Sequence, residues 1–209
     1  MNKINEQLNT LITRCEKLHQ VNPSDYPKIK QSQTDELLAG LESNLSFEQV
    51  ELYANPKFDA RKMRKIRKVL QNGCNPEHLK PYLFIDFNDT QFNLIIDGFR
   101  AGFKLDEIQL YGNPKFDRFQ MMEIFIGLKD HLDTQIIKSY ADTKYNSAEM
   151  RLIRLAALHK FKSEDVEDFL NKGYSNSQIH QISTAIFVGL TAEQIKSFAT
   201  TELSIEQFV

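Results

Sequence analysis

Cationic side chains between positions 61 and 68 are the residues of this chain best suited to a chemical role. Four of them follow the spacing i, i+3, i+4, i+7 from Arg61, so they share one helix face, opposite the apolar Met63, Ile66 and Leu70. Closely spaced guanidinium and ammonium groups suit the binding of phosphates and carboxylates. Together with two flanking cations they form the basic stripe: Arg61, Lys62, Arg64, Lys65, Arg67 and Lys68.

The positive charge of this region is local. Residues 53–81 hold eight Lys or Arg against two acids, a net charge of +6, whereas 24–52 and 82–110 carry −4 and −3 and the whole chain −2. Two interpretations stay open. The basic stripe contacts phosphates or an acidic protein, or it is a solvated helix face paired with acidic neighbours such as Glu48, Glu51 and Asp97.

Residues capable of acid–base or nucleophilic chemistry are present, but they lack the spacing of a catalytic motif. The sequence has no glycine-rich phosphate loop and no GxSxG, HExxH or CxxC pattern. Its five histidines are scattered, and Cys15 and Cys74 are far apart, as expected for reduced thiols. We therefore expect a protein that is not an enzyme and that uses neither a cofactor nor a metal ion.

The elements that position these residues belong to a repeat of 29 residues. An aromatic residue returns at that interval, at Tyr53, Tyr82, Tyr111, Tyr140, Phe169 and Phe198. The clearest copies, Tyr53-Ala54-Asn55-Pro56-Lys57-Phe58-Asp59 and its counterpart at 111–117, differ at one position. A period of this length predicts a stacked array. Copies begin near residues 24, 53, 82, 111, 140 and 169, with a truncated copy from 198.

Each copy carries the signals of a long helix. Residues that favour the N-cap stand at Asp59, Asn88, Asp117, Asn146 and Ser175. In four of these five copies a Glu or Gln follows three residues later, which completes a capping box. The helix exit falls at Asn44, Gly73, Gly102, His131, Lys160 and Gly189. Gly and Asn at four of these positions favour the left-handed conformation that closes a helix.

A shorter helix follows each exit, so each copy is a two-helix hairpin. A hairpin cannot cover its own apolar face, and the sequence therefore predicts an all-α fold, an α-solenoid of stacked hairpins forming a single repeat domain over 24–209. Residues 2–20 form an amphipathic helix that ends at a linker before residue 24. We expect this helix to cap the first repeat, with dimerisation or partner binding as the alternative.

Some apolar residues fall where a one-sided stack of hairpins would face water. Either tight winding buries both faces of the long helices, or these residues form a patch for a protein partner or for a twofold homo-oligomer. The candidate apolar patch comprises Leu94, Phe119, Met122, Ile126, Leu152 and Leu155.

The phrase at 53–59, followed by Met63, Ile66 and Leu70, resembles short helical repeats in proteins of phages and conjugative elements of low-GC Gram-positive bacteria. The resemblance covers the chain from about residue 24. It implies a bacterial cytoplasm and a mobile-element setting, and it assigns no activity and no functional residue.

We expect a soluble cytoplasmic protein, because the chain has no apolar run of membrane-spanning length and its first residues lack a secretion signal. The leading hypothesis is a non-enzymatic scaffold or adaptor for a protein partner. A second is an inhibitor or accessory factor of a nucleic-acid-processing complex, acting through the basic stripe. A third is direct binding to the backbone of DNA or RNA.

Overall fold

The structure, a computed structural model, describes residues 3–199 and contains thirteen α-helices and no β-strand within them. The predicted all-α class is confirmed. No helix in this described part is both long enough and apolar enough to cross a bilayer. The short helix expected at 204–209, and most of the truncated copy from 198, lie outside the described residues.

The helices follow the sequence repeat in strict register. After α1 (Lys3–Val21), six helices of 12 residues each begin at intervals of 29 residues. They are α2 (Gln31–Glu42), α4 (Ala60–Gln71), α6 (Asp89–Arg100), α8 (Arg118–Lys129), α10 (Ser147–Leu158) and α12 (Asn176–Phe187). The shorter helices between and after them are α3 (Phe47–Glu51), α5 (Pro76–Leu83), α7 (Leu105–Tyr111), α9 (Thr134–Tyr140), α11 (Ser163–Asn171) and α13 (Ala192–Phe198).

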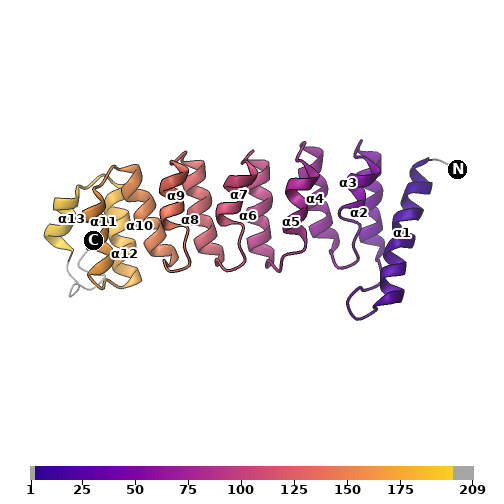
Figure 1. Cartoon of the computed structure of the whole chain (residues 1–209), viewed down its shortest axis with the longest axis horizontal. Coiled ribbons are helices and arrows are strands. Elements are labelled where there is room, and N and C mark those ends of the chain that lie inside the picture. Colours follow the sequence, from indigo (N-terminus) through magenta and orange to yellow (C-terminus); the bar gives the residue numbers. More distant parts are fainter. Residues whose placement is uncertain (1–2, 200–209) are drawn as a thin grey trace. The chain divides into compact units, whose positions relative to one another are not determined.

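The chain forms two compact units. Unit 1 comprises residues 1–86 and 95–103, and unit 2 comprises 87–94 and 104–209. In unit 1, α1 packs along α2, and α2 packs along α4 (Figure 1). In unit 2, α8, α10 and α12 pack in succession, and the short helices α9, α11 and α13 each contact a neighbouring long helix. Each unit is therefore built from hairpins that pack on the next hairpin.

The long helices begin as the capping residues predict. Asp59 accepts a hydrogen bond from the backbone N–H of Lys62, and the other four predicted N-cap residues accept equivalent bonds. In those four copies the Glu or Gln three residues later accepts in turn from the N-cap backbone N–H. All four predicted capping boxes are confirmed.

All six predicted exit residues have the left-handed conformation. His131 and Lys160 adopt φ values of 56° and 58°, although neither is the Gly or Asn that this conformation favours. The paired bonds of a Schellman ending are present at His131, where the N–H of Leu132 donates to Gly127 O and that of His131 to Leu128 O. The hairpin geometry therefore imposes this conformation even where the side chain disfavours it.

Two columns of side chains connect parts of the chain that are distant in sequence. Tyr53 Oη donates to the backbone oxygen of Glu36, and Tyr111 and Tyr140 make the same bond to the residue 17 positions before each of them. Gln33 caps its own helix through Oε1 while its Nε2 donates to Phe58 O at 2.7 Å, in the turn of the next copy. Gln91 and Gln120 repeat this bond to the residue 25 positions ahead.

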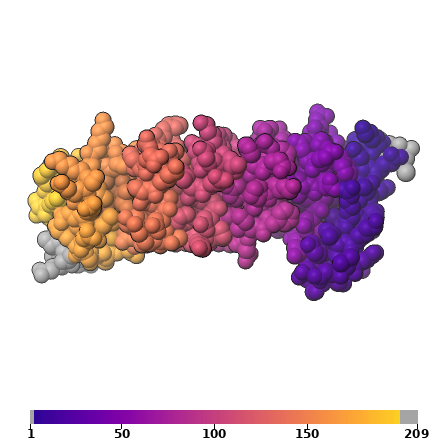
Figure 2. Space-filling model, in the orientation of Figure 1, coloured from indigo at the N-terminus to yellow at the C-terminus, as the bar shows by residue number. Residues whose placement is uncertain are grey.

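The core of each unit follows the repeat. In unit 2, a cluster that includes Leu152, Phe169, Ile182 and Ile186 is almost fully buried. The space-filling view shows that side chains fill the spaces between neighbouring hairpins of this unit (Figure 2). In unit 1, Leu11 and Cys15 of α1 are fully buried, in agreement with a helix that covers the first repeat.

Candidate functional site

The basic stripe does not form one free surface. Glu36, on α2, is only 4% exposed and receives two arginines from α4. Arg64 Nε donates to Glu36 Oε1 at 2.7 Å, and Arg67 Nη2 donates to Oε2 at 2.8 Å. The acidic partner is therefore Glu36, whereas the sequence suggested Glu48, Glu51 or Asp97. Arg67, which the sequence predicts to flank the outward cations and to bind with them, is mostly buried against α2.

The other residues of the stripe also differ in role. Lys62 Nζ donates to Leu83 O at 3.0 Å and lies over the ring of Phe58. Lys65 is half-buried. Within the basic stripe, only Arg61 and Lys68 are both exposed and without an ion pair among the described residues. Two of the six stripe residues, Arg64 and Arg67, thus hold the long helices α2 and α4 together, and they cannot bind a ligand without giving up that contact.

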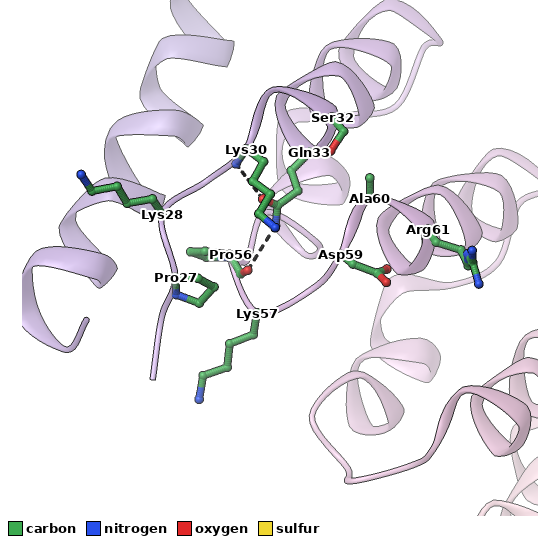
Figure 3. Close-up of a pocket in the computed structure, with 10 residues that line it drawn as sticks. All are labelled: Pro27, Lys28, Lys30, Ser32, Gln33, Pro56, Lys57, Asp59, Ala60 and Arg61. Carbon is green, nitrogen blue, oxygen red and sulfur yellow. Dashed lines mark hydrogen bonds between the residues drawn. The ribbon is translucent and has the colours of Figure 1, made fainter. Parts of the chain in front are cut away.

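A cationic pocket lies at the edge of unit 1 where α2 and α4 begin. It has a volume of about 420 Å³ and includes Arg61 from the stripe. Three lysines from the two adjoining turns, Lys28, Lys30 and Lys57, complete its cations, and Asp59 is its one acid (Figure 3). Four cations against one carboxylate give the pocket a net charge of +3, and none of the four cations has an ion pair within the described residues.

Two turns held side by side form the walls of this pocket. Pro27 and Pro56 lie in these turns, and Gln33 connects them by accepting from Lys30 N and donating to Pro56 O at 3.1 Å. Proline fixes its own backbone φ, so the walls are stiff. In Figure 3, Lys28, Lys57 and Arg61 point away from one another along the rim. The cations therefore present a broad rim and do not enclose a single small anion.

Electrostatics add to the positive potential of the rim. Lys30 occupies the N-cap position of α2 and makes no side-chain cap bond, where the later long helices have Asp, Asn or Ser. The positive end of the α2 dipole therefore has no acidic side chain in the first turn to compensate it. The one acid, Asp59, is engaged with Lys62 N at 2.7 Å, and Lys57 Nζ lies 4.4 Å from the centre of the Tyr26 ring.

Sequence reasoning missed Lys28, Lys30 and Lys57 because they lie outside the helix on which the stripe was drawn. A signal was present: Lys28 and Lys57 occupy the same position in successive copies, and Lys30 replaces an N-cap acid. Within the stripe, only Arg61 joins them at the pocket.

The structure contradicts the candidate apolar patch, because half of its residues are buried. Leu94, Leu152 and Leu155 are at most 4% exposed, and α10, which carries the last two, packs between α8 and α12. Met122 and Ile126 are half-buried, and Phe119 alone is largely exposed. A continuous partner or oligomer surface at these positions is therefore excluded.

The two cysteine thiols are not activated as nucleophiles. Burial raises the pKa of the Cys15 thiol, and that of Cys74, to about 11, so both thiols are protonated at neutral pH. No group of three or more acidic, His or Cys side chains in the described part could hold a metal ion. The described part is thus an all-α protein of repeated hairpins with a cationic pocket in unit 1. No protein family, curated protein or solved structure significantly matches this chain.

Proposed function

We propose that this chain is a non-enzymatic scaffold that holds an acidic segment of a partner protein on the cationic pocket of unit 1. One observation carries the proposal: four cations without ion pairs among the described residues, drawn from two successive copies, border one stiff-walled pocket. Structural duties already explain the other arginines of the basic stripe, Arg64 and Arg67.

The arrangement of the rim favours an extended acidic ligand. Lys28, Lys57 and Arg61 diverge, so a single phosphate could not reach all three, whereas carboxylates spaced along a peptide could. The pocket lining has no aromatic residue, so it offers no exposed ring on which a base could stack. Binding to DNA or RNA, or inhibition of a nucleic-acid-processing complex, is therefore the second candidate, favoured only by the charge.

Peptide and nucleic acid binding by defined variants tests the proposal. The site variant carries Lys28→Glu, Lys57→Glu and Arg61→Glu. The matched control carries Lys115→Glu, Arg118→Glu and Lys144→Glu, which make the same change in charge at equivalent turns and a helix start in unit 2. Fluorescence anisotropy is measured with a labelled Glu-rich peptide and with single-stranded DNA, at salt concentrations of about 50 and 200 mM.

We expect the Glu-rich peptide to bind the native chain and to lose about tenfold in affinity with the site variant, while the control stays within about twofold. Circular dichroism should show unchanged helix content in both variants. An equal loss with the control would contradict the proposal, as would tighter binding of the DNA than of the peptide.

A further inference from the structure

A second hollow, in unit 2, opens between the short helices α9 and α11, with α10 as its floor. It has a volume of about 450 Å³. Ile136 from α9, Ile153 and Ala157 from α10, and Val166 and Leu170 from α11 give it an apolar lining. We name this hollow the α9–α11 groove.

One small residue gives the α9–α11 groove its apolar floor. A comparable hollow lies between α3 and α5, but its lining has no residue of α4, where Leu70 stands at the position of Ala157. Ala157 occupies a repeat position that holds a large apolar side chain elsewhere: Leu70, Phe99, Leu128 and Ile186. The neighbouring isoleucine is affected as well. Ile153 is only half-buried, whereas its counterparts Ile66, Ile95, Ile124 and Ile182 are completely buried. A missing side chain thus uncovers the floor of the groove.

The wall formed by α11 is acidic. Four carboxylates lie within this helix, and its nine residues include no cation. Asp165 and Asp168 are paired with Lys196, and Asp168 also with Lys172. Glu164 and Glu167 have no ion pair in the described residues, and Glu167 lines the groove directly. The groove therefore combines an apolar floor with unneutralised negative charge on one wall.

We propose that the α9–α11 groove binds a short amphipathic segment of a partner protein that carries basic residues beside a bulky apolar side chain. The apolar side chain fills the space beside Ala157, where burial of apolar surface stabilises the complex. A Lys or Arg of the segment lies against Glu167 and Glu164. Charge complementarity selects this partner, and the site is separate from the cationic pocket, which attracts acidic segments.

Restoring the usual side chain of the repeat gives a direct test. Ala157→Leu fills the groove with the residue that stands at the same position in α4 and α8, so folding should be preserved. Ala101→Leu adds the same side chain at an exposed position and serves as the matched control. Urea unfolding of both variants checks that neither loses stability.

Two synthetic helical peptides serve as probes. Both carry Leu along one face, and their flanking residues are Lys in one and Glu in the other. We expect the Lys-flanked peptide to lose about tenfold in affinity with Ala157→Leu and to be unaffected by Ala101→Leu. Binding of the Glu-flanked peptide, which the cationic pocket can hold, should not change with Ala157→Leu. Glu167→Lys should reduce the preference for the Lys-flanked peptide.

Three results would overturn this proposal. They are an equal loss of affinity for the two peptides with Ala157→Leu, undiminished binding of the Lys-flanked peptide by a folded Ala157→Leu variant, and a native chain that self-associates through the groove. Analytical ultracentrifugation of the native chain and of Ala157→Leu detects the last of these. Because the cationic pocket is intact in both variants, failure here would leave its peptide binding unchanged.

Discussion

Arg154 Nε donates to Glu123 Oε2 at 2.9 Å across neighbouring long helices, and this pair repeats the one between Arg67 and Glu36 three copies earlier. Each pair is separated by 31 residues. In the copies between these two, the positions equivalent to Glu36 and Arg67 are Lys65 and Ile96, and then Leu94 and Phe125. The ionic pair is therefore not a general feature of the repeat. A buried charge that lacks its partner is strongly destabilising. We infer that these ion pairs help to fix which copy of the repeat packs against which.

The first prediction concerns the removal of one member of such a pair. Glu36→Ala should reduce the free energy of unfolding by about 3 kcal/mol, because it leaves the mostly buried Arg67 without its partner. Arg64→Ala should cost at most about 1 kcal/mol, since its side chain is 59% exposed. Urea unfolding followed by circular dichroism measures both, and equal losses would refute the assigned roles.

A second prediction follows from the fit between tyrosine and glycine. Gly40 and Gly127 lie against the hydroxyls of Tyr53 and Tyr140, where an added Cβ would overlap the oxygen. At the same two positions the later copies pair Ala156 with Phe169 and Ala185 with Phe198, which lack the hydroxyl. Gly127→Ala should therefore destabilise the protein by about 1–3 kcal/mol.

Tyr140→Phe removes the overlapping oxygen and a hydrogen bond of 3.5 Å, so alone it should cost no more than about 1 kcal/mol. The double variant should be more stable than Gly127→Ala by itself, with a coupling of about 1 kcal/mol or more. Strict additivity of the two single changes in a double-mutant cycle would show that the two sites do not interact.

The third prediction uses the left-handed exits. His131→Gly and Lys160→Gly should each stabilise the protein by about 1 kcal/mol, because both residues have positive φ and carry a Cβ that disfavours it. Gly73→Ala, at an equivalent exit with φ of 84°, should have the opposite effect. Thermal unfolding gives the order of the three variants, and a destabilised His131→Gly would mean that its side chain contributes more than its backbone costs.

The fourth prediction is a loss of stability in alkali. Burial is the main cause that raises the pKa of Cys15 and Cys74 from 9.0 to about 11, and it also raises the pKa of Tyr53 and Tyr140. These groups are neutral in the folded chain and ionise more easily once unfolded. The contribution of the thiols is therefore complete below about pH 9 and is lost as the pH rises through 11, whereas that of the tyrosines begins to fall only above their ordinary pKa of 10.0.

Urea unfolding at intervals from pH 7 to 11 measures this loss, and absorbance near 295 nm reports tyrosine ionisation. The double variant Cys15→Ala and Cys74→Ala should retain the part of the pH dependence that comes from the tyrosines. A flat profile up to pH 11 would contradict the burial of these groups.

Local signals made much of the fold predictable. The N-cap at Asp59, the capping box at Asn88 and the exit at Gly73 depend on residues within one turn of each other, and the 29-residue period gives the helix register. Contacts between copies were less predictable from the sequence. The ion pair of Glu36 with Arg67 requires the offset between two packed helices, and a helical projection of α4 alone places Arg67 only at the flank of the outward face.

The candidate site was predictable only in part for the same reason. Arg61 lies on a helix face that the spacing reveals, whereas Lys28 and Lys57 come together through the packing of two turns. The groove beside Ala157 depends on a missing volume, which becomes visible only when the copies are compared position by position. The burial of Leu94 and Leu152 follows from neighbours on both sides of a helix, which a single hairpin does not show.

Hydrogen exchange of the native chain with and without a Glu-rich peptide tests the central claim most directly, because it locates the bound segment without any substitution. The account predicts slower exchange at residues 26–33 and 55–61, which surround the cationic pocket, and unchanged exchange at the matching turn 113–119. Equal protection at 113–119, or protection that omits 26–33 and 55–61, would contradict it.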